Sequence, residues 1–542
     1  MAEQPVLVIG LDGATFDIVR PWAEAGIMPH IHHLLKQGVS SVLVSTTPPL
    51  TGPAWSSFAT GNHPGKHGNL DFYIIEGDYT LHPISARTIR GWTLWDILSR
   101  AGKRVGIVNV PITYPPRPVN GLMVSGLMTP SLASDFTFPP ELREEIIQRW
   151  PDYSFAVPWR DYEGRVEDLL TALRYTTKQR RDLVLYCMER EEWDFFMAVF
   201  VGMDRVQHCL WRFMDPEHPT YDVKLAARYL PLIQDYYQFL DAVVGEIISA
   251  APEQANIILM SDHGFGPLWK EVDLNRWLAD KGLLAYRSQR HRVTSQIWRV
   301  GRQVVHAIPA LQRMFRHRYG KRLRQGMWEA TFSSAIDWLK TRVYSYAHGG
   351  LFINLRGRES QGIVRPDEYE ALRDELIELL QDMVDPETGQ RIIYRAQRRE
   401  EVYSGPALST APDVIVTEAD ERYYLGFTPT PNLRFLEKTH WKSGYHRYEG
   451  ILIASGPGFQ AGRKLEKASI VDLMPTILYL LDVPIPGDID GQVLEDMLNE
   501  KLLASRSPAY YAADEGENNA GVRLDKKDET VLIERLRSLG YL

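Results

Sequence analysis

The sequence predicts an α/β protein with a largely parallel central sheet sandwiched between helices. Short apolar runs alternate with longer amphipathic stretches over most of the 542 residues. Apolar runs of this kind are typical of strands buried on both faces of a parallel sheet. The chain is long enough to bury a sizeable core, either as one large domain with insertions or as about three smaller domains.

In the first half of the chain, four apolar runs are predicted to be strands, at residues 6–10, 105–110, 195–201 and 257–260. Three helical stretches are predicted at residues 30–36, 161–190 and 226–250. The first of these ends before Gly38, a common residue after a helix. This alternation favours parallel strands, because parallel neighbours need a long crossover, which is usually a helix.

The alternation breaks after Pro267. Between Arg287 and Arg324 the chain carries eleven Lys or Arg residues and no Asp or Glu. Three interpretations stay open: a solvated face of a helical cap, a lid that attracts an anionic substrate, and an amphipathic segment that contacts an anionic membrane surface or nucleic acid. Because this segment follows the predicted strand at 257–260, we expect an inserted, mostly helical cap folded over the end of that strand.

In the second half, strands are predicted at residues 343–355, 414–417 and 450–455, and a helix at 366–384. Ser469 and Asp472 have the spacing of a capping box for a helix that ends at Leu481. A short helix is predicted near the end of the polar tail. The predicted organisation is therefore a catalytic core over residues 1–267 and 346–500, a basic cap over 268–345, and a tail over 501–542.

Composition excludes several classes of protein. With 44% hydrophobic and 24% charged residues, the chain is not disordered, collagen-like or a coiled coil. The net charge of −8 argues against a protein that coats nucleic acid, and two cysteines do not make a disulfide scaffold. We expect a cytoplasmic protein without a transmembrane segment, because the N-terminus lacks a basic segment and no run of about 18 apolar residues occurs.

Acidic and imidazole side chains follow three of the predicted strands. Asp12 comes after the first strand, Asp204 and His208 after the strand at 195–201, and Asp262 and His263 after the strand at 257–260. Ligands of open α/β sheets collect at the carboxyl ends of the strands, so these three groups are candidates for one site. Asp204 and His208 are four residues apart, which places both on one face of a helical turn.

His446, just before the strand at 450–455, adds a sixth candidate ligand. Mixed Asp and His ligands suit a divalent ion such as Zn²⁺ or Mn²⁺. Catalytic ions take about three protein ligands each, so these six residues would serve two ions.

A possible nucleophile lies in the Thr- and Pro-rich segment at residues 46–57. A Thr or Ser hydroxyl attacks poorly unless a base or a metal lowers its pKa. A two-metal site would do so, and it would also hold the oxygens of a phosphoryl group during in-line displacement. The alternative is a loop whose hydroxyls only cap turns.

These residues lie within motifs spread over most of the chain: VIGLDG (8–13), TGPAW (51–55), TG and PGKHG (60–61 and 64–68), SDHG (261–264), and VDLMPT leading to DG (471–476 and 490–491). Together they resemble the alkaline phosphatase superfamily, in its type I phosphodiesterase/nucleotide pyrophosphatase branch. VNVP (108–111), TYPP (113–116) and INLRGR (353–358) are similar to a subgroup described as cytosolic phosphohydrolases or phosphomutases.

The resemblance implies an alkaline-phosphatase-like fold and two metal sites. One ion would be bound by Asp12, Thr51, Asp262 and His263, and the other by Asp204, His208 and His446. Thr51 would be the nucleophile and would carry a covalent phospho-threonine intermediate. Family members also hold the phosphoryl oxygens with an asparagine some way beyond the nucleophile, for which Asn69 and Asn62 are the candidates. Lys442, close to His446, is a further candidate for a phosphate contact.

The predicted function is a metal-dependent phosphohydrolase that acts on a small phosphorylated substrate. A phosphodiester or nucleotide-like compound is favoured as the substrate. Zn²⁺ is the favoured ion, and Mn²⁺ is the alternative. The first alternative is a phosphomutase that returns the phosphoryl group to the same substrate. The second is a non-catalytic protein that binds anions or membranes through the Arg-rich segment. Sulfate-ester and phosphonate hydrolysis are less favoured; sulfatases, for their part, use a modified Cys or Ser.

Overall fold

The computed structural model describes residues 4–287, 335–427, 434–439, 441–512 and 523–539. The strands of its large sheet are β1 (Val6–Leu11), β2 (Val39–Val44), β5 (Val105–Val108), β6 (Gly121–Val124), β7 (Thr137–Phe138), β8 (Phe195–Phe200), β9 (Asn256–Met260), β19 (Glu449–Ser455) and β20 (Lys464–Ser469). Within the described residues their order is β20-β2-β19-β9-β1-β8-β5-β6-β7. Only β19 and β7 run antiparallel to their neighbours in this sheet, so the predicted α/β fold with a largely parallel sheet is confirmed.

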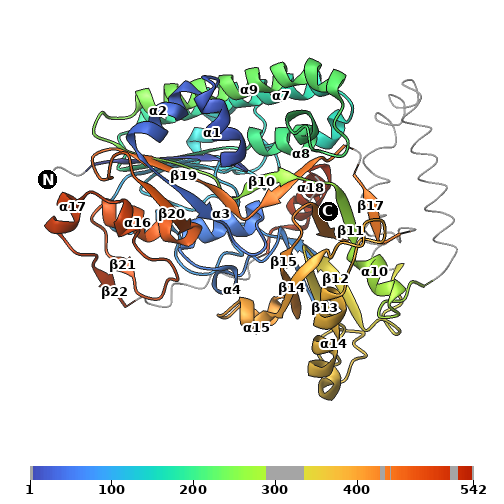
Figure 1. The fold of residues 1–542 in the computed structure, drawn as a ribbon. Helices are drawn as coiled ribbons and strands as arrows, with labels where there is room; N and C mark the ends of the chain where they lie inside the picture. The colour runs from blue at the N-terminus through green and yellow to red at the C-terminus, as the bar shows by residue number, and fades with distance from the viewer. Residues whose placement is uncertain (1–3, 288–334, 428–433, 440, 513–522, 540–542) are drawn as a thin grey trace.

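Helices cover both faces of this sheet (Figure 1). On one face lie α1 (Phe16–Glu24), α2 (Pro29–Gln37), α7 (Val166–Arg190), α8 (Gly202–Met214) and α9 (Val223–Ala250), and on the other lie α3 (Thr51–Thr60), α5 (Leu94–Arg100) and α16 (Leu473–Leu480). Side chains of a strand alternate between faces, and β1 follows this rule. Leu7, Ile9 and Leu11 pack with the first group of helices, whereas Val6 and Val8 pack with the second.

Polar residues at the helix ends explain where several helices begin. The Asp222 carboxylate accepts hydrogen bonds from two backbone N–H groups at the start of α9. Ser469 and Asp472 form the predicted capping box, ahead of α16. These contacts satisfy N–H groups that have no partner inside the helix. Gly61 follows the last residue of α3, and its φ of 64° favours glycine.

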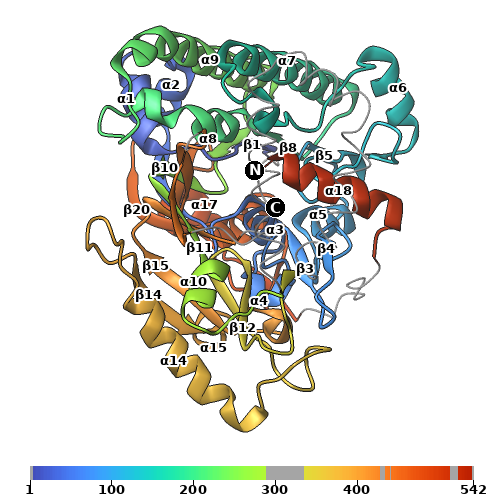
Figure 2. The same ribbon diagram turned by 90° about the vertical axis from the view of Figure 1, so that its right-hand side faces the viewer.

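An insertion separates β10 (Gly264–Pro267) from β18 (Gly444–Arg447), which pair antiparallel. It contains a three-stranded sheet, made of β11 (Lys270–Asp273), β16 (Tyr423–Gly426) and β17 (Leu436–Lys438). It also contains a four-stranded sheet, made of β12 (Val343–Ala347), β13 (Gly350–Ile353), β14 (Ile393–Arg398) and β15 (Val414–Ala419). Figure 2 shows β11, β12, β14 and β15 with α10 (Leu274–Asp280) and α14 (Tyr369–Gln381) below the large sheet.

The insertion therefore extends to Lys438, beyond the predicted limit at residue 345. The difference arises because β13 pairs with β15, and β11 pairs with both β16 and β17. Strand pairing over such long sequence separations leaves no local pattern. The predicted single strand at 343–355 is a hairpin, which turns at Gly349 with a φ of 66°. The Arg-rich stretch lies outside the described residues, except for its first residue, Arg287.

The described residues form nine further α-helices and strands. They are α4 (Pro64–His67), β3 (Tyr73–Ile75), β4 (Leu81–Pro83), α6 (Glu141–Arg149), α15 (Arg399–Val402), β21 (Ile485–Pro486), α17 (Glu500–Ser505), β22 (Tyr510–Tyr511) and α18 (Lys526–Leu539). α18 is the short helix expected near the end of the tail, and the Trp159 indole donates a hydrogen bond to its Leu539 carbonyl. None of the described helices is both long and apolar enough to cross a membrane.

A buried ion pair in the insertion gives a test of its stability. The two Asp413 oxygens each accept a 2.6 Å hydrogen bond from the Arg358 guanidinium, and one also accepts from the Tyr369 hydroxyl. Asp413→Ala would leave a partly buried guanidinium without its main partner, so we expect a loss of about 3–5 kcal/mol in the free energy of unfolding. Chemical denaturation of the full chain measures this loss.

The matched control is Asp374→Ala, because Asp374 pairs with Arg398 at the exposed surface. Exposed ion pairs contribute about 0–1 kcal/mol. Equal losses in the two variants would show that the Asp413 pair does not stabilise the insertion.

Candidate active site and metal centre

The residues predicted from the strand ends meet at one edge of the large sheet. β9, β1 and β8 are neighbours and run parallel, so their carboxyl ends lie side by side. Asp12 directly follows β1, Asp262 and His263 follow β9, and Asp204 lies in the first turn of α8, just after β8. The backbone N–H of Asp204 donates to the carbonyl of Asp12, which ties the two strand ends together.

One cluster surrounds Thr51, the first residue of α3. The Thr51 hydroxyl lies 3.3 Å from Nε2 of His263. The same nitrogen lies 3.6 Å from Oδ1 of Asp12 and 3.4 Å from Oδ2 of Asp262. All four residues are buried. The four residues that the family resemblance assigns to the first ion therefore lie together.

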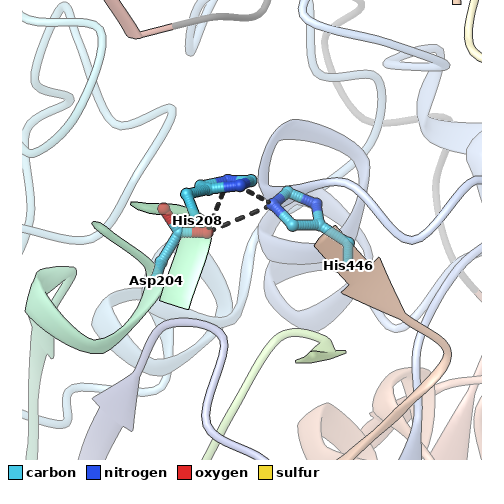
Figure 3. A group of neighbouring side chains, drawn as sticks. All are labelled: Asp204, His208 and His446. Atoms are coloured by element: carbon cyan, nitrogen blue, oxygen red, sulfur yellow. Dashed lines mark hydrogen bonds and ion pairs between the residues drawn. The ribbon is translucent and has the colours of Figure 1, made fainter. Parts of the chain in front are cut away.

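The second cluster consists of Asp204, His208 and His446 (Figure 3). Nε2 of His446 lies 3.1 Å from both Asp204 Oδ1 and His208 Nε2. Asp204 and His208 share a face of α8, as their spacing predicts, whereas His446 comes from β18. β18 reaches the site by pairing with β10, which places His446 opposite Phe265.

The three histidines present their Nε2 lone pairs to this centre. Nδ1 of His208 contacts the carbonyl of Gly444, Nδ1 of His446 that of Pro49, and Nδ1 of His263 that of Gly264, at 3.0–3.1 Å. A carbonyl oxygen only accepts, so each Nδ1 carries the proton. In a neutral ring this leaves Nε2 as a bare acceptor, and burial lowers the pKa of both His208 and His446. Hydrogen bonds at the other ring nitrogen orient metal-binding histidines in the same way.

Each of the three carboxylates likewise uses one of its two oxygens for a hydrogen bond to a protein group outside the centre. Asp12 Oδ2 accepts from the Trp55 indole, Asp262 Oδ1 from the Gly13 backbone, and Asp204 Oδ2 from the Arg205 guanidinium. Asp204 Oδ1 faces His208 and His446. The two remaining oxygens, Asp12 Oδ1 and Asp262 Oδ2, are buried without a hydrogen bond among the described residues. Each carboxylate thus keeps one oxygen for the centre.

The site is electrostatically unfavourable by itself. Burial, followed by the charges of Asp262 and Asp204, raises the pKa of Asp12 well above its usual range. Burial also raises the pKa of Asp262 to about 8. For Asp204 burial acts in the same direction, but His208 and Arg205 outweigh it and hold the pKa of Asp204 well below its usual range. Converging lone pairs and unpartnered buried carboxylate oxygens are the donor set that a divalent cation needs, so these residues fit metal ions.

Aromatic and polar neighbours that the sequence did not reveal hold the ligands in place. The Trp159 ring stacks on His208, with ring centroids 5.5 Å apart. The Gln207 amide donates to the Gly13 carbonyl, which links α8 to the β1 end. Of these three neighbours, only Trp55 could have been found from the sequence. It follows Thr51 by four residues on the same helix and so shares a face with it.

The three candidates for a phosphate contact have different surroundings. The Asn69 amide donates to the Ser56 hydroxyl, and its oxygen accepts from the Thr88 hydroxyl. Both of its polar atoms are thus engaged with protein groups, and a phosphoryl contact by Asn69 stays a prediction. Asn62 also uses its amide within the chain, by donating to the Thr60 carbonyl. Lys442 lies close to the second cluster, and burial lowers the pKa of its ammonium to about 8.

The fold and these paired clusters define a hydrolase of the alkaline phosphatase superfamily. Residues 6–449 match the family model described as type I phosphodiesterase/nucleotide pyrophosphatase. The chain belongs to this family. The resemblance drawn from its motifs is confirmed, and the chain is an enzyme rather than a non-catalytic binding protein.

One solved structure shares the fold at low sequence identity. Human ectonucleotide pyrophosphatase/phosphodiesterase 5 matches with a TM-score of 0.51 and 15% identity, over 92% of this chain and 100% of that chain. Its murine counterpart, an inactive form in complex with AMP, matches with a TM-score of 0.49 and 15% identity, over the same shares. A comparison with curated proteins found no match.

The charge arrangement predicts that divalent cations stabilise the fold. Wild-type protein should unfold at a higher temperature with Zn²⁺ or Mn²⁺ than with a chelator, because a cation that binds only the folded state adds about 2.7 kcal/mol at a hundredfold excess over its Kd. Thermal unfolding followed by circular dichroism measures the shift.

The Asp12→Asn/Asp204→Asn double variant should lose most of this shift, whereas Asp367→Asn, at an exposed position, should keep it. An undiminished shift in the double variant would show that the cations bind elsewhere.

Proposed function

We propose that the protein is a divalent-metal-dependent phosphohydrolase that cleaves phosphodiesters, nucleotide-like compounds included, with Thr51 as the nucleophile. The observation that carries the proposal is the convergence of three imidazole Nε2 atoms and three carboxylate oxygens at one edge of the sheet, with the buried Thr51 hydroxyl 3.3 Å from the Nε2 of His263. The family match supports phosphoester hydrolysis as the reaction class.

The proposed ligands of one ion are Asp12, Thr51, Asp262 and His263, and those of the other are Asp204, His208 and His446. When bound, the ions supply positive charge that favours the ionised hydroxyl and offsets the charge of the phosphoryl oxygens. Three imidazoles and three carboxylates are a mixed nitrogen and oxygen donor set, which favours Zn²⁺ and also accommodates Mn²⁺.

The residues of the chain prepare the nucleophile. Thr51 is fully buried at the N-terminus of α3, the end of a helix whose dipole favours negative charge. His263 Nε2 lies within hydrogen-bonding distance of the hydroxyl and orients it. Trp55, Gly13 and Arg205 hold the outer oxygens of the three carboxylates, so the ligands need little rearrangement.

In the proposed first step, Thr51 Oγ1 loses its proton to solvent and bonds to phosphorus, while the bond from phosphorus to the leaving oxygen breaks. The leaving oxygen takes a proton from water. In the second step a water oxygen bonds to phosphorus and the water gives up one proton, while the bond from phosphorus to Oγ1 breaks and Oγ1 takes up a proton in its place. The products are an alcohol and a phosphate monoester. The phosphomutase alternative would share the first step, and it stays a prediction.

Substitution of Thr51 tests the nucleophile. Thr51→Val keeps the shape of the side chain but removes the attacking oxygen, so kcat on bis(4-nitrophenyl) phosphate with added Zn²⁺ or Mn²⁺ should fall by about 10³-fold or more. Thr51→Ser should retain measurable activity, because it keeps a hydroxyl. Mass spectrometry of acid-quenched wild type should find a phosphoryl adduct on the peptide that contains Thr51.

Thr171→Val is the matched control, since Thr171 lies exposed on α7 and should leave the rate unchanged. The proposal fails if Thr51→Val keeps wild-type activity, or if no phosphate ester is hydrolysed with either cation.

A further inference from the structure

Lys442 is a buried cation beside the metal centre with few partners. Its side chain is 9% exposed, and its ammonium lies 4.1 Å from the ring centroids of both Tyr424 and Tyr445. Among the described residues its ion pair is with Glu271, at 4.0 Å, and that carboxylate is 44% exposed. Cation–π contacts offset part of the cost of burying an ammonium, but they do not replace a hydrogen-bonded anion.

The insertion supplies two of these neighbours. Glu271 lies on β11 and Tyr424 on β16, and the two are partners in a parallel pair of strands. Partners in register point to the same face of a sheet, so both side chains face Lys442. The three-stranded sheet of the insertion thus forms a wall beside the metal centre. The side chains of this wall are not among the candidate metal ligands.

A chain of hydrogen bonds fixes the position of Tyr424. Its hydroxyl lies 2.7 Å from Nε2 of His348, in the β12–β13 turn. Nδ1 of His348 in turn lies 3.1 Å from Oδ2 of Asp71. Since a carboxylate accepts, His348 donates from Nδ1 and accepts the Tyr424 hydroxyl at Nε2. Tyr424 is therefore a fixed part of the wall rather than a mobile surface residue.

The Tyr445 ring contacts both the Lys442 ammonium and the second cluster. The Tyr445 ring stacks on His446, with centroids 4.7 Å apart and planes 8° apart, and it contacts Tyr424 at 4.5 Å. A phosphoryl group under attack by Thr51 must lie next to His446 and His263. Tyr445 is therefore shared between the place of this phosphoryl group and the surroundings of Lys442.

We propose that Lys442, with Tyr424 and Tyr445, forms a subsite for an anionic group on the leaving part of the substrate, either a second phosphate or a carboxylate. This inference rests on the proposed function. Lys442 would donate hydrogen bonds to the anion, and Glu271 would serve as the weaker counterion when no substrate is bound. The subsite makes Lys442 a residue that determines specificity, not one that carries the chemical step.

Three substrates, each with a methyl ester on the side that stays on phosphorus, separate the effect of a charged leaving group from that of a neutral one. Methyl 4-nitrophenyl phosphate has a leaving group without a further charge. Methyl 3-carboxy-4-nitrophenyl phosphate adds a carboxylate to the same leaving group, and P1,P2-dimethyl pyrophosphate has a phosphate monoester as its leaving group. Nitrophenolate absorbance follows the first two reactions, and phosphorus NMR follows the third.

The test variant is Lys442→Met, which keeps a long apolar side chain against the two tyrosines and removes the charge. We expect kcat/KM to fall by about tenfold to hundredfold on the two substrates with anionic leaving groups, the range for a lost charged hydrogen bond, and to stay within about twofold on the neutral one. A loss on one anionic substrate alone would also support the subsite and would identify phosphate or carboxylate as its ligand.

Lys438→Met is the matched control, because Lys438 is a lysine on β17 with a side chain 69% exposed. It should leave all three rates within about twofold of wild type. Lys442→Arg should restore part of the lost kcat/KM on the anionic substrates, since it restores the charge.

An equal loss on all three substrates, or no loss on either anionic one, would overturn the subsite while leaving the proposed function intact. A failure of wild type on every substrate with Zn²⁺ and Mn²⁺ would instead refute the proposed function, and the inference would fall with it.

Discussion

The structure depends on a concentration of like charge at one edge of its sheet. Parallel pairing of β9, β1 and β8 brings Asp262, Asp12 and Asp204 to adjacent strand ends, where water is excluded. Among the cations of the chain, only Arg205 forms a direct ion pair with one of these carboxylates within the described residues. Such an arrangement is costly for an empty protein and favourable for one that binds divalent cations. Binding of divalent cations by these carboxylates would therefore both stabilise the folded chain and supply the charge that the proposed reaction needs.

The outer contacts of the candidate ligands show how the fold tolerates this arrangement. Each carboxylate uses one oxygen to accept a protein hydrogen bond, and each imidazole uses Nδ1 to donate one. The remaining oxygens and nitrogens are thereby held toward one centre. Because the partners are backbone groups and buried side chains, the ligand geometry is inherited from the sheet and from α3 and α8 rather than from mobile loops.

The residues proposed for catalysis and for specificity come from different parts of the chain. The proposed nucleophile and metal ligands come from the large sheet and from β18, whereas Tyr424 and Glu271, beside Lys442, come from the insertion. Substitutions in the insertion would then change which leaving groups the enzyme prefers, without disturbing the candidate metal ligands. The hydrogen-bonded chain from Asp71 through His348 to Tyr424 couples the core to this wall, because Asp71 precedes the insertion and the other two belong to it.

Sequence patterns alone determined the identity of the candidate ligands and the strands that carry most of them. An apolar run followed by Asp12, or by Asp262 and His263, is a local signal, and so is the spacing of Asp204 and His208. Tertiary structure alone decided the rest. The contact of His446 with Asp204, the hydrogen bond from Trp55 to Asp12, the extent of the insertion and the surroundings of Lys442 all join segments distant along the chain. Such contacts follow from strand order and pairing, which the periodicity of a single segment does not encode.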